Sequence, residues 1–192
     1  MEEIPAGSGI GRRNIELKPA LLRIAILGAE SSGKSTLAEA LAQRYRTLWI
    51  PEYLREFVDT TGRTPEPHEQ ILIARTQIAR ELAAAADARA KDYLFCDTTP
   101  VMTAIYSRYC FGSVDAPLAA LARAHRYELT LVAAPDCPWE ADGLQRVSDA
   151  VRQDIHREVL ATLDDMETPY VLIAGALEER IRQVATLLTP RA

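Results

Sequence analysis

The stretch Gly28-Ala29-Glu30-Ser31-Ser32-Gly33-Lys34-Ser35 decides how the rest of the chain is interpreted. It has two glycines with four residues between them, followed directly by Lys and Ser, which is the pattern of a phosphate-binding loop. The apolar run before it, residues 21–27, predicts a buried strand, and residues 36–45 after it have helical periodicity. A strand, a glycine-rich loop and a helix in this order direct backbone N–H groups and a positive helix end at one anion. This context favours a nucleotide phosphate site over a chance glycine-rich turn.

Residue types within the loop suggest individual roles. Gly28 allows the chain to leave the strand sharply, and Gly33 lets the backbone approach a phosphate without a Cβ in the way. Lys34 supplies a positive charge for the β- and γ-phosphates, and the Ser35 hydroxyl can ligate Mg²⁺. The expected nucleotide-binding residues are Gly28, Glu30, Ser31, Ser32, Gly33, Lys34, Ser35 and Thr36.

Composition excludes several classes of protein. The chain has 192 residues, 48% of them apolar and 26% charged, which suits one domain with a complete hydrophobic core. A net charge of −5 without a basic block argues against a nucleic-acid partner. No apolar run approaches the roughly 20 residues that cross a bilayer, and the N-terminus lacks a signal-peptide core. Cys96, Cys110 and Cys137 lack metal-ligand spacing and are typical of reduced thiols in a cytoplasmic protein.

Strands and helices alternate along the chain after a flexible leader, residues 1–19. Strands are expected at residues 21–27, 46–51, 92–96, 129–134 and 170–174. Helices are expected at residues 36–45, 68–89, 100–109, 116–124, 148–166 and 176–188, and a further helix is expected to begin at residue 52. In the long helix, the apolar residues Ile71, Ala74, Ile78, Leu82 and Ala85 mark the expected buried face. Alternation predicts a parallel sheet covered on both faces. We therefore expect residues 20–192 to form one α/β domain, a three-layer α/β/α P-loop sandwich with a five-stranded parallel sheet in the order 2-3-1-4-5.

Polar residues follow the second and third expected strands, at the edge where open parallel sheets bind ligands. Glu52 could hold or deprotonate a substrate hydroxyl, and Arg55, one helical turn later, could orient it or bind phosphate. The alternative is a surface helix start, where Glu is favoured by the dipole. Asp97 suits a Mg²⁺-bound water or a general base. Thr98 or Thr99 could cap the next helix.

Residues 136–152 read as a loop or lid beyond the fourth strand. Trp139 offers a flat face for a base or a cationic ring. Arg146 and Arg152 could neutralise the charge on a transferred phosphoryl group, and only one of them is expected to reach it. The alternative is an exposed polar loop with Trp139 tucked into the core.

Five segments together resemble the ribosylnicotinamide kinase domain of the bacterial multifunctional NAD-biosynthesis regulator family. They are residues 26–36, 49–56, 97–99, 109–112 and 136–143. The resemblance covers about residues 22–188 and implies ATP- and Mg²⁺-dependent phosphorylation of the 5′-hydroxyl of nicotinamide riboside, giving nicotinamide mononucleotide. The sequence departs from the family at Gln145, where Arg is usual and Arg146 follows instead, and at Tyr106, where Trp is usual. The family's DNA-binding and adenylyltransferase domains are not found in this sequence, so those activities are not implied.

The site expected from these patterns has three parts. The catalytic residues are Lys34, Glu52, Asp97, Arg146 and Arg152, and the metal ligands are Ser35 and Asp97. The substrate-binding residues are Glu52, Tyr53, Arg55, Asp97 and Trp139.

Two other functions remain open from the sequence. One is a kinase for another nucleoside or small metabolite, and the other is a regulatory module that binds a nucleotide as a switch. Residues 133–138 contain no Asn-Lys-x-Asp guanine reader, which argues against a GTPase. The length leaves no room for the sensor and oligomerisation elements of a mechanical ATPase. The pattern fixes neither the acceptor nor the oligomeric state.

Overall fold

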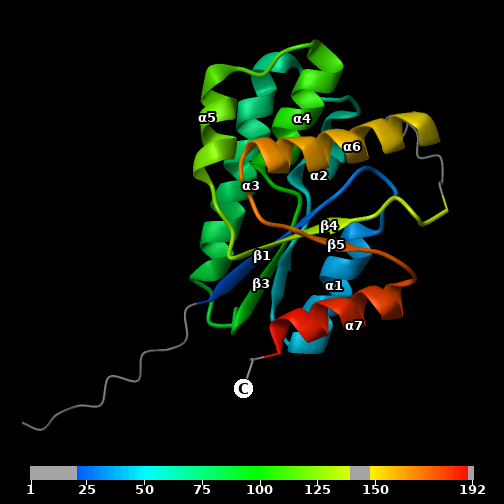
Figure 1. The fold of residues 1–192 in the computed structure, drawn as a ribbon. Helices are drawn as coiled ribbons and strands as arrows, with labels where there is room; N and C mark the ends of the chain where they lie inside the picture. Colours follow the sequence, from blue (N-terminus) through cyan, green and yellow to red (C-terminus); the bar gives the residue numbers. More distant parts are fainter. Residues whose placement is uncertain (1–20, 139–147, 190–192) are drawn as a thin grey trace, which may run out of the picture.

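The computed structural model describes residues 21–138 and 148–189, which form a parallel sheet between two layers of helices (Figure 1). The strands are β1 (Leu22–Leu27), β2 (Leu48–Ile50), β3 (Tyr93–Asp97), β4 (Leu129–Ala133) and β5 (Val171–Ile173). Their order in the sheet is β2-β3-β1-β4-β5, and every neighbouring pair is parallel. The predicted fold and strand order are confirmed.

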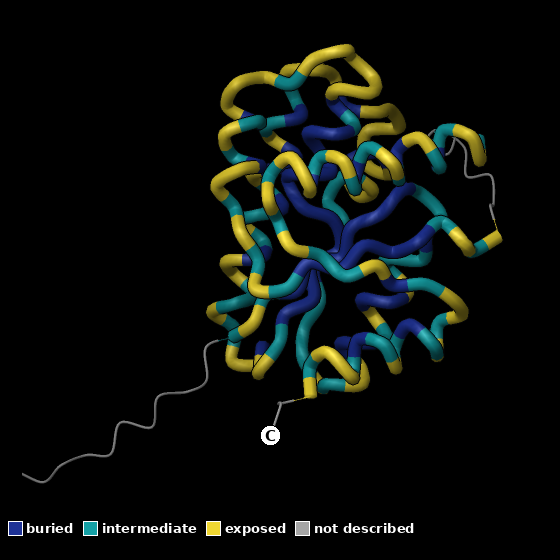
Figure 2. Tube along the Cα trace, in the orientation of Figure 1, coloured by how far each residue is buried: buried dark blue, intermediate teal, exposed yellow. Residues whose placement is uncertain are grey.

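The helices divide between the two faces of the sheet. They are α1 (Lys34–Tyr45), α2 (Tyr53–Thr61), α3 (Gln70–Ala85), α4 (Pro100–Phe111), α5 (Ala116–Ala124), α6 (Asp149–Asp165) and α7 (Leu177–Leu188), with a 3₁₀ turn at Pro67–Glu69. Strand β1 shows the division, because its successive side chains alternate between faces. Ile24 and Ile26 pack against α1 and α7, whereas Ala25 and Leu27 pack with α3 to α6. Two apolar clusters therefore cover the two faces of the sheet, and Figure 2 shows that its central strands are buried.

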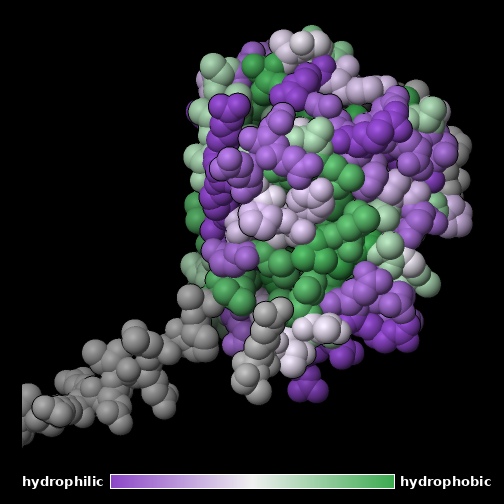
Figure 3. Space-filling model, in the orientation of Figure 1, coloured by the Kyte–Doolittle hydropathy of each residue, from purple (hydrophilic) through white to green (hydrophobic). Residues whose placement is uncertain are grey.

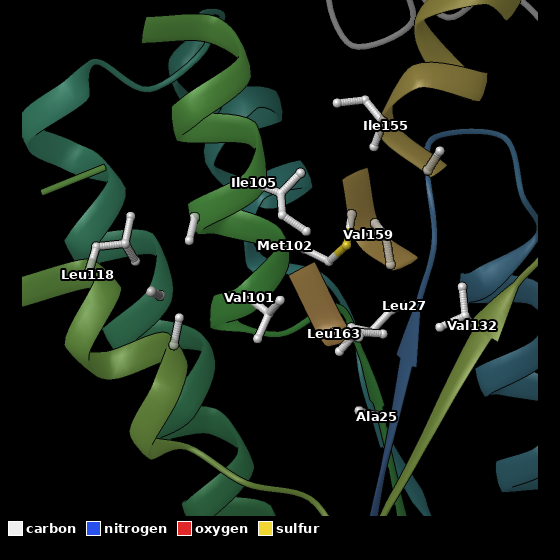
Figure 4. Packing of buried hydrophobic residues seen from close by; sticks show 14 residues of the cluster. Ala25, Leu27, Val101, Met102, Ile105, Leu118, Val132, Ile155, Val159 and Leu163 are labelled. Carbon is white, nitrogen blue, oxygen red and sulfur yellow. The ribbon is translucent and has the colours of Figure 1, made fainter. Parts of the chain in front are cut away.

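The larger core layer lies over the α4 side of the sheet (Figure 4). Met102 and Ile105 of α4 and Leu163 of α6 are each 1% exposed and pack there with the β1 side chains. On the opposite layer, Phe95 is completely buried. Apolar side chains also reach the surface over the β5 edge of the sheet (Figure 3), where Leu172 is 48% exposed. Within the described ranges, no helix is long and apolar enough to cross a membrane.

Helix α3 differs from its predicted form. The expected helix of residues 68–89 is divided into the 3₁₀ turn and a shorter α3. Ala74 is buried as predicted, but the buried face also includes Ile73, Gln77 and Glu81. Leu82, expected inside, is 58% exposed, whereas Gln77 and Glu81 are 3% and 0% exposed. The polar residues can be buried because they have partners: Glu81 accepts a hydrogen bond from the Tyr127 hydroxyl at 3.0 Å and contacts His125 at 2.9 Å. Apolar periodicity alone therefore placed Leu82 wrongly and missed the polar part of the buried face.

Candidate functional site

The phosphate loop lies between β1 and α1, and its two glycines are needed for different reasons. A Cβ on Gly28 would lie 2.8 Å from both the Ala133 carbonyl oxygen and the Ser32 hydroxyl, so no side chain fits there. A Cβ on Gly33 would make only ordinary contacts, and this residue is required for its φ of +78° as the cap before α1. No side chain caps the helix, so the N–H groups of its first turn are available to an anion.

Arg180 of α7 is hydrogen-bonded to the backbone of the phosphate loop and is only 2% exposed. Its Nη1 donates to the Ser32 carbonyl at 2.6 Å, and its Nε donates to the Gly175 carbonyl at 2.7 Å. Its Nη2 donates to the Ala134 carbonyl at 3.1 Å and forms an ion pair with Asp136. A buried guanidinium that is this fully bonded fixes the position of the loop backbone.

Arg152 of α6 is a second support, and it is 5% exposed. Its Nη1 donates to the Cys137 carbonyl at 2.8 Å and reaches the Ser31 carbonyl at 3.4 Å, while its Nε donates to Asp149 at 2.8 Å. The structure thus places Arg152 against loop carbonyl groups and outside the cavity wall described below. Arg146 and Trp139, the other predicted residues of this segment, lie outside the described residues.

Lys34, Ser35 and Asp97 meet where α1 begins and β3 ends. Lys34 Nζ donates to the Ala29 carbonyl at 2.9 Å, and Ser35 Oγ donates to Asp97 Oδ2 at 2.5 Å. Asp97 is 1% exposed, and within the described part of the chain its Oδ1 has no hydrogen-bond partner. Burial raises the pKa of Asp97, while Lys34 and the Ser35 hydroxyl oppose that shift. A buried carboxylate oxygen without a donor is a site that still needs a cation or a proton donor.

The residues after Asp97 depart from the expected helix cap. Thr98 has a φ of +72°, a strained conformation for a β-branched residue. Thr99 occupies the cap position of α4, but its side chain makes no capping hydrogen bond. The chain therefore turns at Thr98 directly after Asp97, and the Asp97 side chain meets the phosphate loop at Ser35.

Glu52 and Arg55 face the same cavity as Asp97. Glu52 is half-buried at the start of α2, and desolvation raises its pKa. Lys34 lowers this pKa and Asp97 raises it further, so the two carboxylates influence each other's titration. Arg55 lowers the pKa of both, which places it electrostatically within the same group.

Tyr53 is not among the residues that line the cavity, so its role as a substrate contact stays a prediction from the sequence. Tyr53 is the first residue of α2, directly after the extended cap residue Glu52. Its ring packs beside Phe57 and lies under the Arg80 guanidinium, 4.5 Å from the ring centroid. Its backbone N–H donates to Gln77 Oε1 at 3.0 Å.

Gln77 is a supporting residue that the sequence did not reveal. Its Oε1 accepts the hydrogen bond from the Tyr53 N–H, and its Nε2 donates to the backbone carbonyl of Asp97 at 3.3 Å. One buried amide of α3 therefore connects the start of α2 with the end of β3 and keeps Glu52 and Asp97 in register. No local pattern marks it, because its two partners are distant in the sequence.

The cavity beside the loop has a volume of about 560 Å³. Its polar lining is Glu30, Ser31, Ser32, Lys34, Ser35, Thr36, Glu52, Arg55, Thr64, Gln70, Asp97 and Thr98, and its apolar and aromatic lining includes Trp49, Pro51, Leu54, Val58, Met102, Tyr106, Tyr109, Phe111 and Val151. The wall therefore combines carboxylates, a lysine and other polar groups with apolar and aromatic side chains. The dimensions and the mixed lining suit a small organic molecule.

A second cavity of about 290 Å³ is lined by the same loop. Its walls are Ser31, Gly33, Thr36, Cys137, Pro138, Leu177 and Arg180, of which the first three also line the larger cavity. The phosphate loop is therefore a wall common to two cavities. Within the described ranges, no group of three or more His, Cys, Asp or Glu side chains could hold a metal ion.

Comparisons with known proteins point to one group. A family model described as an AAA domain matches residues 23–180. The chain is 30% identical over 155 residues to the trifunctional NAD biosynthesis/regulator protein NadR of Salmonella typhimurium (strain LT2), covering 77% of this chain and 37% of that protein. A match to NadR of Escherichia coli (strain K12) is 29% identical over 166 residues, covering 82% of this chain and 40% of that protein. The chain thus spans about two fifths of the length of these relatives.

Solved structures show the same likeness at the level of the fold. A NadR protein in complex with NR superposes with a TM-score of 0.73 at 18% identity, covering 88% of this chain and 51% of the other. A NadR protein in complex with NAD and AMP-PNP superposes with a TM-score of 0.71 at 16% identity, covering 90% and 51%. These matches confirm the resemblance to the NAD-biosynthesis regulator family predicted from the motifs.

Proposed function

The chain belongs to this AAA domain family, and from that premise we propose that it is an ATP-dependent kinase that phosphorylates the 5′-hydroxyl of nicotinamide riboside. The product would be nicotinamide mononucleotide. One observation carries the proposal: the phosphate loop opens into a cavity of about 560 Å³ whose wall holds both Glu52 and Asp97. A donor phosphate bound at the loop and an acceptor hydroxyl beside a carboxylate are what phosphoryl transfer requires.

ATP binds with its phosphates on the loop in this proposal. The uncapped N-terminus of α1 and the Lys34 ammonium meet the β- and γ-phosphates. The adenosine end occupies the smaller cavity, where Pro138 and Leu177 supply apolar surface and Thr36 lies at the loop. The solved NadR protein that carries AMP-PNP supports this donor.

The residues present fit a Mg²⁺ ion. Ser35 offers a hydroxyl, and Asp97 offers a carboxylate with one oxygen that has no partner within the described residues. Mg²⁺ prefers such oxygen ligands together with water and phosphate oxygens. When bound, the ion would neutralise charge on the phosphates. We therefore assign Asp97 to the metal side of the site.

Glu52 then remains as the general base. It accepts the proton of the 5′-hydroxyl while that oxygen forms a bond to the γ-phosphorus. The bond from the γ-phosphorus to the β,γ-bridging oxygen breaks, and ADP leaves with the bond's electron pair. The raised pKa of Glu52 suits this role, because it makes the carboxylate a stronger proton acceptor than an exposed glutamate.

Nicotinamide riboside is proposed as the acceptor because of the relatives. The solved NadR protein in complex with NR and the identity to NadR support it. The aromatic lining of the large cavity agrees with a ring-bearing substrate. Absence of nucleic-acid and membrane partners, and a cytoplasmic location, stay predictions from the sequence.

A panel of nucleosides tests the proposal. The protein is incubated with ATP, Mg²⁺ and each nucleoside, and ADP release and phosphorylated product are both measured. We expect the highest kcat/KM with nicotinamide riboside, and no product from the Lys34→Ala variant. A higher kcat/KM with another nucleoside would establish the alternative kinase. Binding of ATP without phosphorylation of any nucleoside would instead indicate a regulatory module.

A further inference from the structure

Glu30 is a carboxylate inside a loop built to bind anions, and this position needs an explanation. Its Oε2 accepts a hydrogen bond of 2.6 Å from the hydroxyl of Tyr106 in α4. Within the described residues, no ion pair with a basic side chain is recorded for it. Burial and the negative charge of Glu30 raise the pKa of Tyr106 well above its usual value, so the phenol stays a donor.

The donor nucleotide gives no reason for this charge. Phosphates on the loop would repel the Glu30 carboxylate, and they already have Lys34 and the backbone N–H groups. The side chain instead extends toward α4, where Met102, Tyr106 and Cys110 follow one another at four-residue spacing and line the large cavity. Glu30 therefore presents a negative charge to the apolar and aromatic side of the acceptor cavity.

Aromatic rings and a carboxylate together form a site for an organic cation. Trp49, Tyr106, Tyr109 and Phe111 line this cavity, and aromatic faces attract cations through their quadrupole. Glu30 is partly buried beside these rings, and its carboxylate attracts a cationic ring but gives no comparable attraction to a neutral base. Charge is thus a property by which this cavity can select its substrate.

We infer that Glu30, oriented by Tyr106, is the residue that selects an acceptor with a positively charged ring over a neutral one. This inference rests on the proposed function, since it assigns the base of the acceptor to the side of the cavity lined by Glu30 and α4. Glu30 contacts the substrate ring, and Tyr106 is a positioning residue that acts through Glu30.

Two forms of one riboside isolate charge from shape. The pyridinium ring of nicotinamide riboside carries a fixed positive charge, whereas the ring of its 1,4-dihydro form is neutral and nearly isosteric. We would measure kcat and KM for both compounds at saturating ATP with wild type, Glu30→Gln and Tyr106→Phe. Glu39→Gln is the matched control, because it makes the same change at an exposed position of α1.

Glu30→Gln should lower kcat/KM for the cationic riboside by about tenfold or more, mainly through KM, and should change that of the neutral form less than about twofold. Tyr106→Phe should act in the same direction with a smaller effect, and Glu39→Gln should resemble wild type. Equal losses for both ribosides in Glu30→Gln would mean that Glu30 only holds the loop to α4, and this would overturn the inference. Unchanged kinetics for both ribosides would also overturn it.

Calorimetric binding of the two ribosides separates this inference from the proposed reaction. If wild type phosphorylates neither compound but binds the cation, and Glu30→Gln does not, the reaction is wrong and the cation site stands. If wild type binds the two forms equally, the selectivity is wrong whatever the reaction is. Thermal unfolding of each variant confirms that the isosteric changes leave the fold intact.

Discussion

Replacing Arg180 by methionine is the most direct test of how the phosphate loop is held. Methionine has a similar length but no donors, so the change removes the bonds to the carbonyls of Ser32, Gly175 and Ala134 and the ion pair with Asp136. Breaking one side of a buried ion pair costs about 3–5 kcal/mol. Since the Asp136 side chain is 38% exposed and can be partly hydrated, we expect about 3 kcal/mol.

Urea unfolding followed by circular dichroism measures this loss. With a slope of about 2 kcal/mol/M, a loss of about 3 kcal/mol moves the midpoint down by about 1.5 M. Arg182→Met is the matched control, because Arg182 lies on the same helix in an ion pair with Glu179 and is 73% exposed; its midpoint should stay at the wild-type value. In the double variant with Asp136→Asn, the loss should be smaller than the sum of the two single losses.

The same variant should weaken ATP binding. Ser32 lies within the phosphate loop, and releasing its carbonyl lets the loop adopt conformations that do not present its N–H groups to phosphate. We expect the Kd for ATP to rise at least about tenfold in Arg180→Met at a temperature where the protein is folded. A midpoint shift no larger than that of Arg182→Met, or an unchanged Kd in the folded variant, would refute the role given to Arg180.

Further predictions concern the loop and the two carboxylates. Lys34→Ala should abolish phosphoryl transfer and weaken ATP binding without unfolding the protein; unchanged activity in a folded variant would contradict this. Glu52→Gln should lower kcat by about 10²–10⁴-fold, and the acidic limb of the wild-type pH–kcat profile should lie above the range of an ordinary glutamate, because the pKa of Glu52 is raised. Asp97→Asn should lower kcat but raise Tm near neutral pH. A raised folded-state pKa means that ionisation of Asp97 costs stability as pH rises through that pKa, so the Tm difference should shrink on acidification. Gly28→Ala should destabilise the fold by more than the usual value of about 1 kcal/mol, since its Cβ would lie 2.8 Å from the Ala133 carbonyl; a normal Tm would contradict the close approach.

The elements and their order could be predicted because they depend on local pattern. Each strand is an apolar run, and the helix expected at 148–166 is present as α6, where the Ser148 side chain accepts from the Val151 N–H as the cap. The meeting of Ser35 with Asp97 was also predictable, because the carboxyl ends of neighbouring parallel strands lie at one edge and Ile26 pairs with Asp97 in the sheet.

The residues that support the site and the core could not be predicted, because the groups they bind are distant in the sequence. Arg180 is one charged residue on an amphipathic helix until the fold brings it to Ser32 and Asp136. Glu81 looks like a surface residue until Tyr127 and His125 are seen around it. A polar residue of this kind can be buried because it has hydrogen-bond partners, whereas hydrophobic periodicity predicts only which face of a helix is mostly apolar.

The wall shared by the two cavities has a thermodynamic consequence. Ser31, Gly33 and Thr36 line both, so a ligand in either cavity restricts the same stretch of backbone. The first ligand to bind loses binding free energy because it orders the loop, and the second ligand then binds to a loop that is already ordered. Linkage requires the effect to be reciprocal: ATP should tighten the riboside by the same factor by which the riboside tightens ATP. Calorimetric titration of each ligand, with the other site empty or saturated and with a non-hydrolysable ATP analogue, measures both factors. If each affinity is the same with the other site empty or saturated, the shared backbone does not couple the two sites.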